Sequence, residues 1–139
     1  MVNFFIKDGT VEDVIRNLYL IRDLIPAKKN LDEEEVRNRL KKKHGVKLAY
    51  INGEEIGLTV WHELDEETGY LWLGAYKIIG KGIGSIVLES IIDEMRKNDY
   101  KRITVKTGMN TIAANRHLTK YGFKTVKNEN GTLYWEKSL

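Results

Sequence analysis

Glycine occupies every second position at the start of the segment Gly80-Lys81-Gly82-Ile83-Gly84-Ser85. This segment connects a predicted strand to a predicted helix. Before it, Tyr70 to Tyr76 is apolar and aromatic, which is typical of a β-strand. After it, apolar residues recur at helical spacing, and we expect the buried side of this helix to hold Ile86, Val87, Ile91, Ile92 and Met95. A strand, a glycine turn and a helix in this order predict a crossover connection, so the fold mixes strands and helices.

The other segments predict hairpins and further helices. Asn52-Gly53 is a strong signal for a tight hairpin, whereas His62 to Gly69 is expected to be an acidic loop. The other predicted strands are Val2 to Lys7, Val46 to Ile51, Glu55 to Trp61, Arg102 to Lys106, Phe123 to Lys127 and Thr132 to Lys137. The other predicted helices are Val11 to Ile25, a segment capped by Asn30 that ends in Lys41-Lys42-Lys43-His44-Gly45, and a last one from Asn110 or Thr111 to Tyr121.

The order of these elements, β-α-α-β-β-β-α-β-α-β-β, combines hairpins with one crossover. It therefore predicts an α+β fold built on a mixed sheet. The chain has 139 residues and no repeat, linker or low-complexity segment, so we expect a single domain over residues 1–139.

Composition narrows the chemistry. The chain has no cysteine, which excludes a disulfide, a thiolate zinc site, an iron–sulfur site and a cysteine nucleophile, and we expect no metal. No signal peptide is apparent and no apolar stretch approaches the ~20 residues of a membrane span, so we expect a soluble, cytoplasmic protein. The net charge of +3 divides into −3 over residues 1–70 and +6 over residues 71–139.

The glycine segment predicts a phosphate-binding loop. Glycine allows close approach of a ligand, and a helix start offers free N–H groups with a partial positive charge. A dinucleotide fingerprint does not fit, because the third glycine comes one residue early. A Walker loop does not fit either, because Ala75 replaces its first glycine and Gly82 its magnesium-binding Ser or Thr.

The segment Ile79 to Gly84 resembles the [RQ]-x-x-G-x-[GA] pyrophosphate loop of the GNAT superfamily of acyl-CoA-dependent N-acetyltransferases. The similarity extends along the chain. Leu71 to Gly74 occupies the place of the family's bulged strand, and Asn110 to Ala114 followed by Leu118 to Phe123 is similar to its N-x-x-A…Y-e-k-x-G-F segment. The expected order of elements matches too, so the resemblance covers essentially the whole chain.

This resemblance implies acetyl-CoA as the acyl donor and assigns its binding residues. The loop amides of Gly80, Lys81, Gly82, Ile83, Gly84 and Ser85 would hold the pyrophosphate. The pantetheine arm would run beside the backbone of Leu73, Gly74 and Ala75, where an N–H group can also hold an oxyanion. Asn110 or Thr111 would touch the coenzyme from the start of the last helix.

The sequence also departs from the family pattern. Ile79 replaces a Gln or Arg that contacts the coenzyme, and Leu118 replaces the tyrosine that often protonates the leaving thiolate. Lys106 stands where some relatives carry a glutamate base. His62, Glu63, Tyr70 and Tyr76 stay open as candidate bases, and no catalytic residue is assigned.

The leading hypothesis is acetyl transfer from acetyl-CoA to a primary amine by direct attack in a ternary complex. The alternative is a non-catalytic acyl-CoA-binding sensor or interaction module of the same fold. Nucleic acid is not an expected partner, because the basic residues form no patch interleaved with aromatic residues. A membrane is not an expected partner either, because no apolar stretch is long enough to span one. The acidic first half suggests a cationic small-molecule or protein amine as acceptor, near Glu33 to Glu35 and Glu129, and relatives that are often dimers suggest a homodimer.

Overall fold

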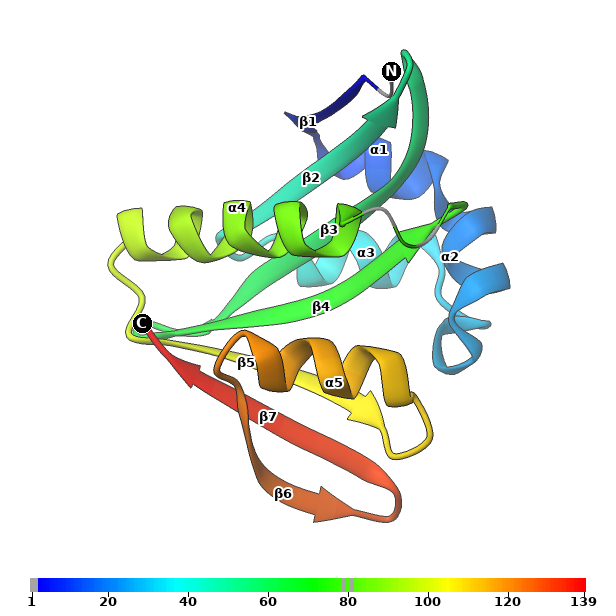
Figure 1. Ribbon diagram of the computed structural model, residues 1–139. Helices are drawn as coiled ribbons and strands as arrows, with labels where there is room; N and C mark the ends of the chain where they lie inside the picture. Colours follow the sequence, from blue (N-terminus) through cyan, green and yellow to red (C-terminus); the bar gives the residue numbers. More distant parts are fainter. Residues whose placement is uncertain (1–2, 79, 81) are drawn as a thin grey trace.

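Seven strands of the described residues form one mixed sheet in the order β1-β2-β3-β4-β5-β7-β6 (Figure 1). The computed structural model describes residues 3–78, 80 and 82–139. Neighbouring strands are antiparallel except β4 and β5, which run parallel, so the predicted α+β fold with a mixed sheet is confirmed. The strands are β1 (Phe4–Asp8), β2 (His44–Ile51), β3 (Glu54–Asp65), β4 (Thr68–Tyr76), β5 (Arg102–Gly108), β6 (Lys124–Glu129) and β7 (Thr132–Ser138).

Helices cover both faces of the sheet (Figure 1). Three helices and a 3-10 turn pack on one face, and α4 and α5 pack on the other. Among the described residues, no helix is both long and apolar enough to cross a bilayer. The helical elements are α1 (Val11–Arg16), α2 (Leu18–Leu24), η1 (Pro26–Lys28), α3 (Glu33–Arg39), α4 (Ile83–Lys97) and α5 (Ile112–Lys120).

Each face of the sheet has its own apolar core. On the face of α1 to α3, Val14, Ile21 and Val36 are fully buried against β3 and β4. On the other face, the buried stripe of α4 is Ile83, Val87, Leu88, Ile91, Ile92 and Met95. The expectation that Ile86 joins this stripe is wrong, because it lies on the same side of the helix as Ser90 and Asp93 and is 45% exposed.

The first predicted helix is interrupted at Asn17, which separates α1 from α2. Asn17 is buried, and its side-chain amide donates to the carbonyl of Asp13 (2.8 Å) and to the Glu55 carboxylate (3.2 Å). A side chain that bonds the backbone in this way competes with continuation of the helix. The apolar periodicity runs through the break, and for that reason the sequence predicted one helix.

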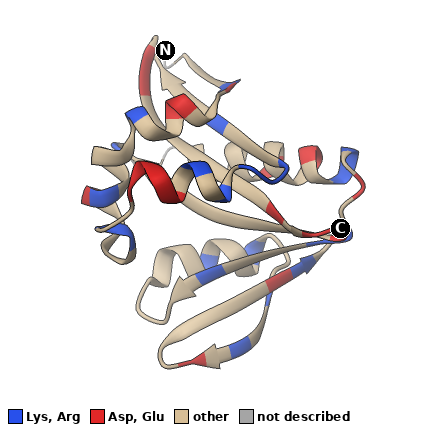
Figure 2. Cartoon of the chain, turned by 180° about the vertical axis from the view of Figure 1, so that it is seen from behind, with Lys and Arg blue, Asp and Glu red and all other residues tan. Residues whose placement is uncertain are grey.

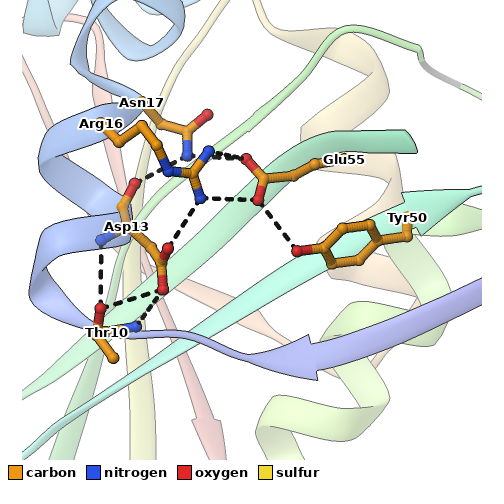
Figure 3. A network of polar contacts seen from close by, with 6 residues as sticks. All are labelled: Thr10, Asp13, Arg16, Asn17, Tyr50 and Glu55. Carbon is orange, nitrogen blue, oxygen red and sulfur yellow. Dashed lines mark hydrogen bonds and ion pairs between the residues drawn. The ribbon is translucent and has the colours of Figure 1, made fainter. Parts of the chain in front are cut away.

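Glu55 on β3 is the centre of the polar network that holds α1 to the sheet (Figure 3). Arg16 binds its carboxylate with both terminal guanidinium nitrogens (2.7 and 2.8 Å) and also reaches Asp13 (2.8 Å). The hydroxyl of Tyr50 on β2 donates to the same carboxylate (3.2 Å). Side chains from β2 and α1 therefore bind the half-buried carboxylate of a single residue on β3.

The second predicted helix starts later and ends earlier than expected. Its N-cap is Asp32, not Asn30, since the Asp32 carboxylate accepts the backbone N–H of Glu35 (2.9 Å). The helix ends at Arg39, and the basic run that was expected to finish it leads into β2, whose first residues are His44 and Gly45. Figure 2 shows the acidic start and basic end of α3 on one face of the molecule.

The expected acidic loop from His62 to Gly69 is wrong, because most of it belongs to two paired strands. β3 continues to Asp65 and β4 begins at Thr68, with a short turn between them. His62 and Thr68 are buried, so the inward side chains hold this hairpin in the sheet, while Asp65, Glu66 and Glu67 face solvent.

Candidate functional site

Strands β4 and β5 pair over four residues and then separate (Figure 1). Their parallel register starts at Thr68 and Arg102 and ends at Leu71 and Val105. Beyond this point, in the described part of the chain, β4 pairs only with β3, and β5 pairs only with β7. We call this separation the fork. One edge of β4 beyond the fork therefore offers backbone groups that no neighbouring strand takes up.

A β-bulge lies where the fork begins. Trp61 pairs with Leu71 and Val60 pairs with Leu73, so Trp72 is one residue more than the partner strand opposes. A bulge increases the local twist and bends the strand. The expected bulged strand is thus found, and the predicted backbone contacts Leu73, Gly74 and Ala75 follow directly after the bulge along the fork.

A pocket of about 420 Å³ lies between the beginning of α4 and α5. Five of the six residues predicted to form the phosphate-binding loop line this pocket. The sixth, Lys81, lies outside the described residues, as does Ile79, which replaces the Gln or Arg of the family pattern. The lining residues are Tyr76, Ile78, Gly80, Gly82, Ile83, Gly84, Ser85, Ala113, Ala114 and His117.

The backbone of the glycine loop suits an anion. Gly80 and Gly82 have φ values of +87° and +75°, in the left-handed region that glycine adopts without strain. Gly82 is the N-cap of α4 and has no side chain that could accept the amides of the first turn. The N–H groups of that turn and the positive end of the helix dipole therefore face the pocket that Gly84 and Ser85 line.

His117 on α5 is a pocket residue that sequence reasoning missed. Its Nε2 atom is buried, has no hydrogen-bond partner among the described residues, and lies 3.6 Å from where a Cβ on Gly84 would stand. The ring packs against Tyr121 with a centroid distance of 5.0 Å. A lone histidine in a helix gives no sequence signal, and only the packing of α5 against α4 shows its position.

The predicted contacts at the start of α5 sit at the edge of this arrangement. Thr111 is the N-cap of α5, and its hydroxyl donates to the carbonyl of Gly108 (2.6 Å) instead of capping the helix. Asn110 is exposed, and neither residue is among those that line the pocket. Asn115 fixes this turn, since it accepts from the Thr107 hydroxyl (2.6 Å) and donates to Gly108 (3.2 Å).

His62 is a buried, neutral candidate base whose nitrogens are both engaged. Burial lowers the pKa of its imidazole, and the nearby charge of Arg39 lowers it further. Nδ1 lies 3.1 Å from the carbonyl of Glu63, and Nε2 lies 3.4 Å from a guanidinium nitrogen of Arg39. With Nδ1 donating to the carbonyl, the Nε2 lone pair faces the guanidinium, so this imidazole is not free to take a proton.

The other candidate bases are engaged in a hydrogen bond or have a raised pKa because they are buried. The Glu63 carboxylate accepts a hydrogen bond from the hydroxyl of Tyr100 (2.8 Å). Tyr100 lies just before β5, at the end where β4 and β5 pair. Burial raises the pKa of Tyr70, and it raises the pKa of Tyr76 to about 12, although the hydrogen bond between Tyr76 and Thr59 opposes the shift. A tyrosine with so high a pKa stays protonated at neutral pH.

The position where the family pattern has a tyrosine holds Leu118, which has no hydroxyl. Leu118 is buried in the core beneath α5. The hydroxyl of Tyr121, one turn later, donates to Glu89 on α4 (3.3 Å). The departure at Leu118 is therefore a change in packing as well as a missing hydroxyl.

A second pocket, of about 280 Å³, lies at the far end of α4 between Lys47, Asp93, Glu94 and Lys97. Two of these charges are paired within the chain, because the Lys47 ammonium contacts Glu94 (3.4 Å) and also Asp8 (2.5 Å). In the described residues, no three histidine or acidic side chains gather as a metal site requires.

Residues 15–123 match the acetyltransferase (GNAT) family. None of the curated proteins matches the sequence. A GNAT family acetyltransferase from Elizabethkingia anophelis, crystallised with acetyl-CoA bound, is 24% identical over 99% of both chains, with a TM-score of 0.79.

Two further solved structures share the fold. The PaiA N-acetyltransferase from Thermoplasma acidophilum, in complex with coenzyme A, is 15% identical over 99% of both chains, with a TM-score of 0.82. An IAA acetyltransferase from Bacillus cereus is 18% identical over 99% of this chain and 100% of that one, with a TM-score of 0.80. Together with the family match, the fork and the glycine loop at the start of α4 lead to one conclusion: the chain belongs to the GNAT acetyltransferase family.

Proposed function

We propose that the protein transfers an acetyl group from acetyl-CoA to a primary amine. The observation that carries this proposal is the position of the fork beside the glycine-loop pocket. An open strand edge and a helix start that suits an anion therefore lie next to each other. The acetyl-CoA and coenzyme A bound by the relatives from E. anophelis and T. acidophilum support the same donor.

In this proposal the glycine loop binds the pyrophosphate, through the amides of Gly80, Lys81, Gly82, Ile83, Gly84 and Ser85. The pantetheine arm pairs with the open edge of β4 at Leu73, Gly74 and Ala75. Asn110 or Thr111 contributes a polar contact near the start of α5, and we add His117, whose unpartnered Nε2 faces the loop.

The chemistry is direct attack. The amine nitrogen, once deprotonated, attacks the thioester carbonyl carbon; the C–S bond then breaks and the thiolate leaves and takes up a proton. A backbone N–H on the open edge of β4 stabilises the oxyanion between these two steps. Because the chain has no cysteine, an acyl-cysteine intermediate is excluded.

Two measurements test the proposal. Titration calorimetry with acetyl-CoA tests donor binding, and no heat at millimolar ligand would contradict it. Thiol release from acetyl-CoA across a panel of amines tests transfer, with hydrolysis in the absence of amine as the blank. The predictions of a cytoplasmic location, of a homodimer and of no nucleic-acid partner remain predictions.

The alternative function is an acyl-CoA-binding module without catalysis. The burial of Leu118 and the bond between Tyr121 and Glu89 favour it, because neither offers an acid to the leaving thiolate. Loss of that acid is compatible with activity, since a thiol with a reference pKa of about 8.5 is a tolerable leaving group. Binding of acetyl-CoA without turnover of any amine would favour the module.

A further inference from the structure

Cationic side chains gather over aromatic rings on the sheet face that carries α1 to α3. The Arg39 guanidinium lies 4.8 Å, and the Lys28 ammonium 5.9 Å, from the centre of the Trp72 ring. The Lys106 ammonium lies 5.7 Å from the centre of the Tyr70 ring. We call this group the cation–aromatic cluster; its members are Lys28, Arg39, Tyr70, Trp72, Lys106 and Tyr134.

The cluster lies at the fork, on the face opposite to the glycine-loop pocket. Trp72 and Lys106 are the first residues of β4 and β5 beyond the last pair that joins the two strands. Trp72 packs with the core of α1 to α3, whereas the pocket is lined by α4 and α5. Lys106 also lies 5.2 Å from the ring centre of Tyr134 on β7, so the cluster spans both arms of the fork.

The cluster carries more positive charge than the carboxylates around it neutralise. Arg39 pairs with Glu35 (3.1 Å), while Lys28 and Lys106 form no ion pair with any described residue. Glu129, an acid close enough to feel the charge of Lys106, pairs with Lys127 (2.5 Å). Burial lowers the pKa of Lys28, and repulsion from Arg39 and Lys106 adds to that effect although Glu35 opposes it.

The cluster also contains a buried donor that lacks an acceptor. Trp72 is only 5% exposed, and its indole N–H has no hydrogen-bond partner among the described residues. Buried N–H groups are almost always paired in native proteins. Ammonium, guanidinium and indole N–H groups are all donors, so the chemistry that complements them is an anionic oxygen.

We propose that the amine acceptor also carries a carboxylate or phosphate group, which binds the cation–aromatic cluster while its amino group reaches the fork. This proposal rests on the proposed acetyl transfer. It differs from the cationic acceptor that the acidic first half suggested, because Glu33 and Glu35 pair with Arg37 and Arg39 of the same helix. Those carboxylates are compensated within the chain, whereas the ammonium groups of the cluster are not.

Matched acceptors test the charge directly. γ-Aminobutyrate, butylamine and putrescine share a backbone and end in a carboxylate, a methyl and an ammonium group. O-Phosphoethanolamine and ethanolamine form a second pair, which separates phosphate from carboxylate. We expect kcat/KM for at least one anionic member to exceed that of its neutral partner by about tenfold or more. If neither anionic amine exceeds its neutral partner, or if putrescine equals or exceeds both anionic amines, the proposal is overturned and acetyl transfer is left intact.

A variant locates the anion site. Lys106 is exposed, so Lys106→Gln should fold, and we expect it to raise KM for the anionic acceptor about tenfold while KM for butylamine and for acetyl-CoA stays unchanged. Lys101→Gln, an exposed lysine just before the same strand, is the matched control and should change neither value. Lys28→Gln should repeat the effect of Lys106→Gln, because Lys28 reaches the Trp72 side of the cluster from η1. Unchanged KM for the anionic acceptor in both cluster variants would refute the assignment.

Failure of the two proposals can be told apart. A protein that binds no acetyl-CoA and acetylates none of the five amines would contradict the proposed function itself. If acetyl-CoA binds but no amine is acetylated, calorimetry on the CoA-saturated protein with γ-aminobutyrate and O-phosphoethanolamine decides the matter. Binding that Lys106→Gln weakens supports the anion site, and absence of binding to the wild type overturns it.

Discussion

Leu71 on β4 and Val105 on β5 form the last pair of residues that joins these two strands. The residues that follow each of them, Trp72 and Lys106, belong to arms of the sheet that pair with different neighbours. The site thus forms where β4 and β5 stop pairing with each other. The bulge in β4 and the different neighbours of the two strands together account for this separation. The glycine loop lies on one face of this separation and the cation–aromatic cluster on the other.

Gly84→Val should weaken acetyl-CoA binding by about tenfold or more, because its methyl groups would stand among the amides of the first helical turn and beside His117. Calorimetry measures the change. Asp93→Val is the control, since it places the same side chain at an exposed position of the same helix. An unchanged affinity in Gly84→Val would contradict the assignment of the loop to the pyrophosphate.

His117→Leu should change stability and binding in opposite directions. Removing a buried polar atom that lacks a partner should stabilise the free protein by about 1 kcal/mol. The same change should weaken acetyl-CoA binding severalfold, because it removes a donor that faces the loop. Thermal melts without ligand and calorimetry with ligand provide the two readouts. Equal destabilisation of both would show that the imidazole serves only packing.

The network around Glu55 should make stability depend on acid pH. Hydrogen bonds from Arg16 hold the pKa values of Glu55 and Asp13 below their ordinary 4.5 and 3.8. Their stabilising contribution is therefore complete above these ordinary values and is lost as the pH falls through the lowered ones. Glu55→Gln should cost about 1–3 kcal/mol at neutral pH, and less as the pH falls below 4.5. Urea melts at several pH values measure this, and a constant difference would contradict it.

Glu94→Ala should destabilise the fold more than Lys47→Met. The Glu94 carboxylate accepts the indole N–H of Trp61 (2.9 Å) and faces the largely buried Lys47 ammonium (3.4 Å). Its removal leaves the buried Trp61 indole N–H without its acceptor and leaves Lys47 with Asp8 alone, at a cost of about 3 kcal/mol. An apolar chain of similar length can replace a buried ammonium nearly neutrally. Denaturant midpoints rank the two variants, and the reverse order would show that the ion pair itself dominates.

Much of the fold is predictable from local patterns. The order of strands and helices, the Asn52-Gly53 hairpin and the glycine turn before α4 each depend on residues close together in the sequence. The positions of the loop glycines at the start of α4 follow from the same turn. The predicted beginning of α3 failed by two residues, because Asn30 and Asp32 are both good caps and only Asp32 faces a free amide.

The features that failed depend on partners far along the chain. The break at Asn17 is stabilised by Glu55, which lies 38 residues away. The hairpin at His62 to Gly69 has the acidic composition of a loop, but His62 packs edge-on against the rings of Tyr70 and Trp72 on the neighbouring strand. His117 and the cation–aromatic cluster depend on packing between helices and strands that no local pattern encodes.

The bulge at Trp72 is required by the site but not by the pairing of the strands. Since Trp61 already pairs with Leu71 and Val60 with Leu73, a chain that lacks Trp72 keeps both pairs in register and gains a regular ladder. Without the bulge, β4 would lose its bend and could run on beside β5. A deletion of one residue would then give a shorter protein with an unbroken sheet, which lacks the open edge of β4 that the proposed transfer requires.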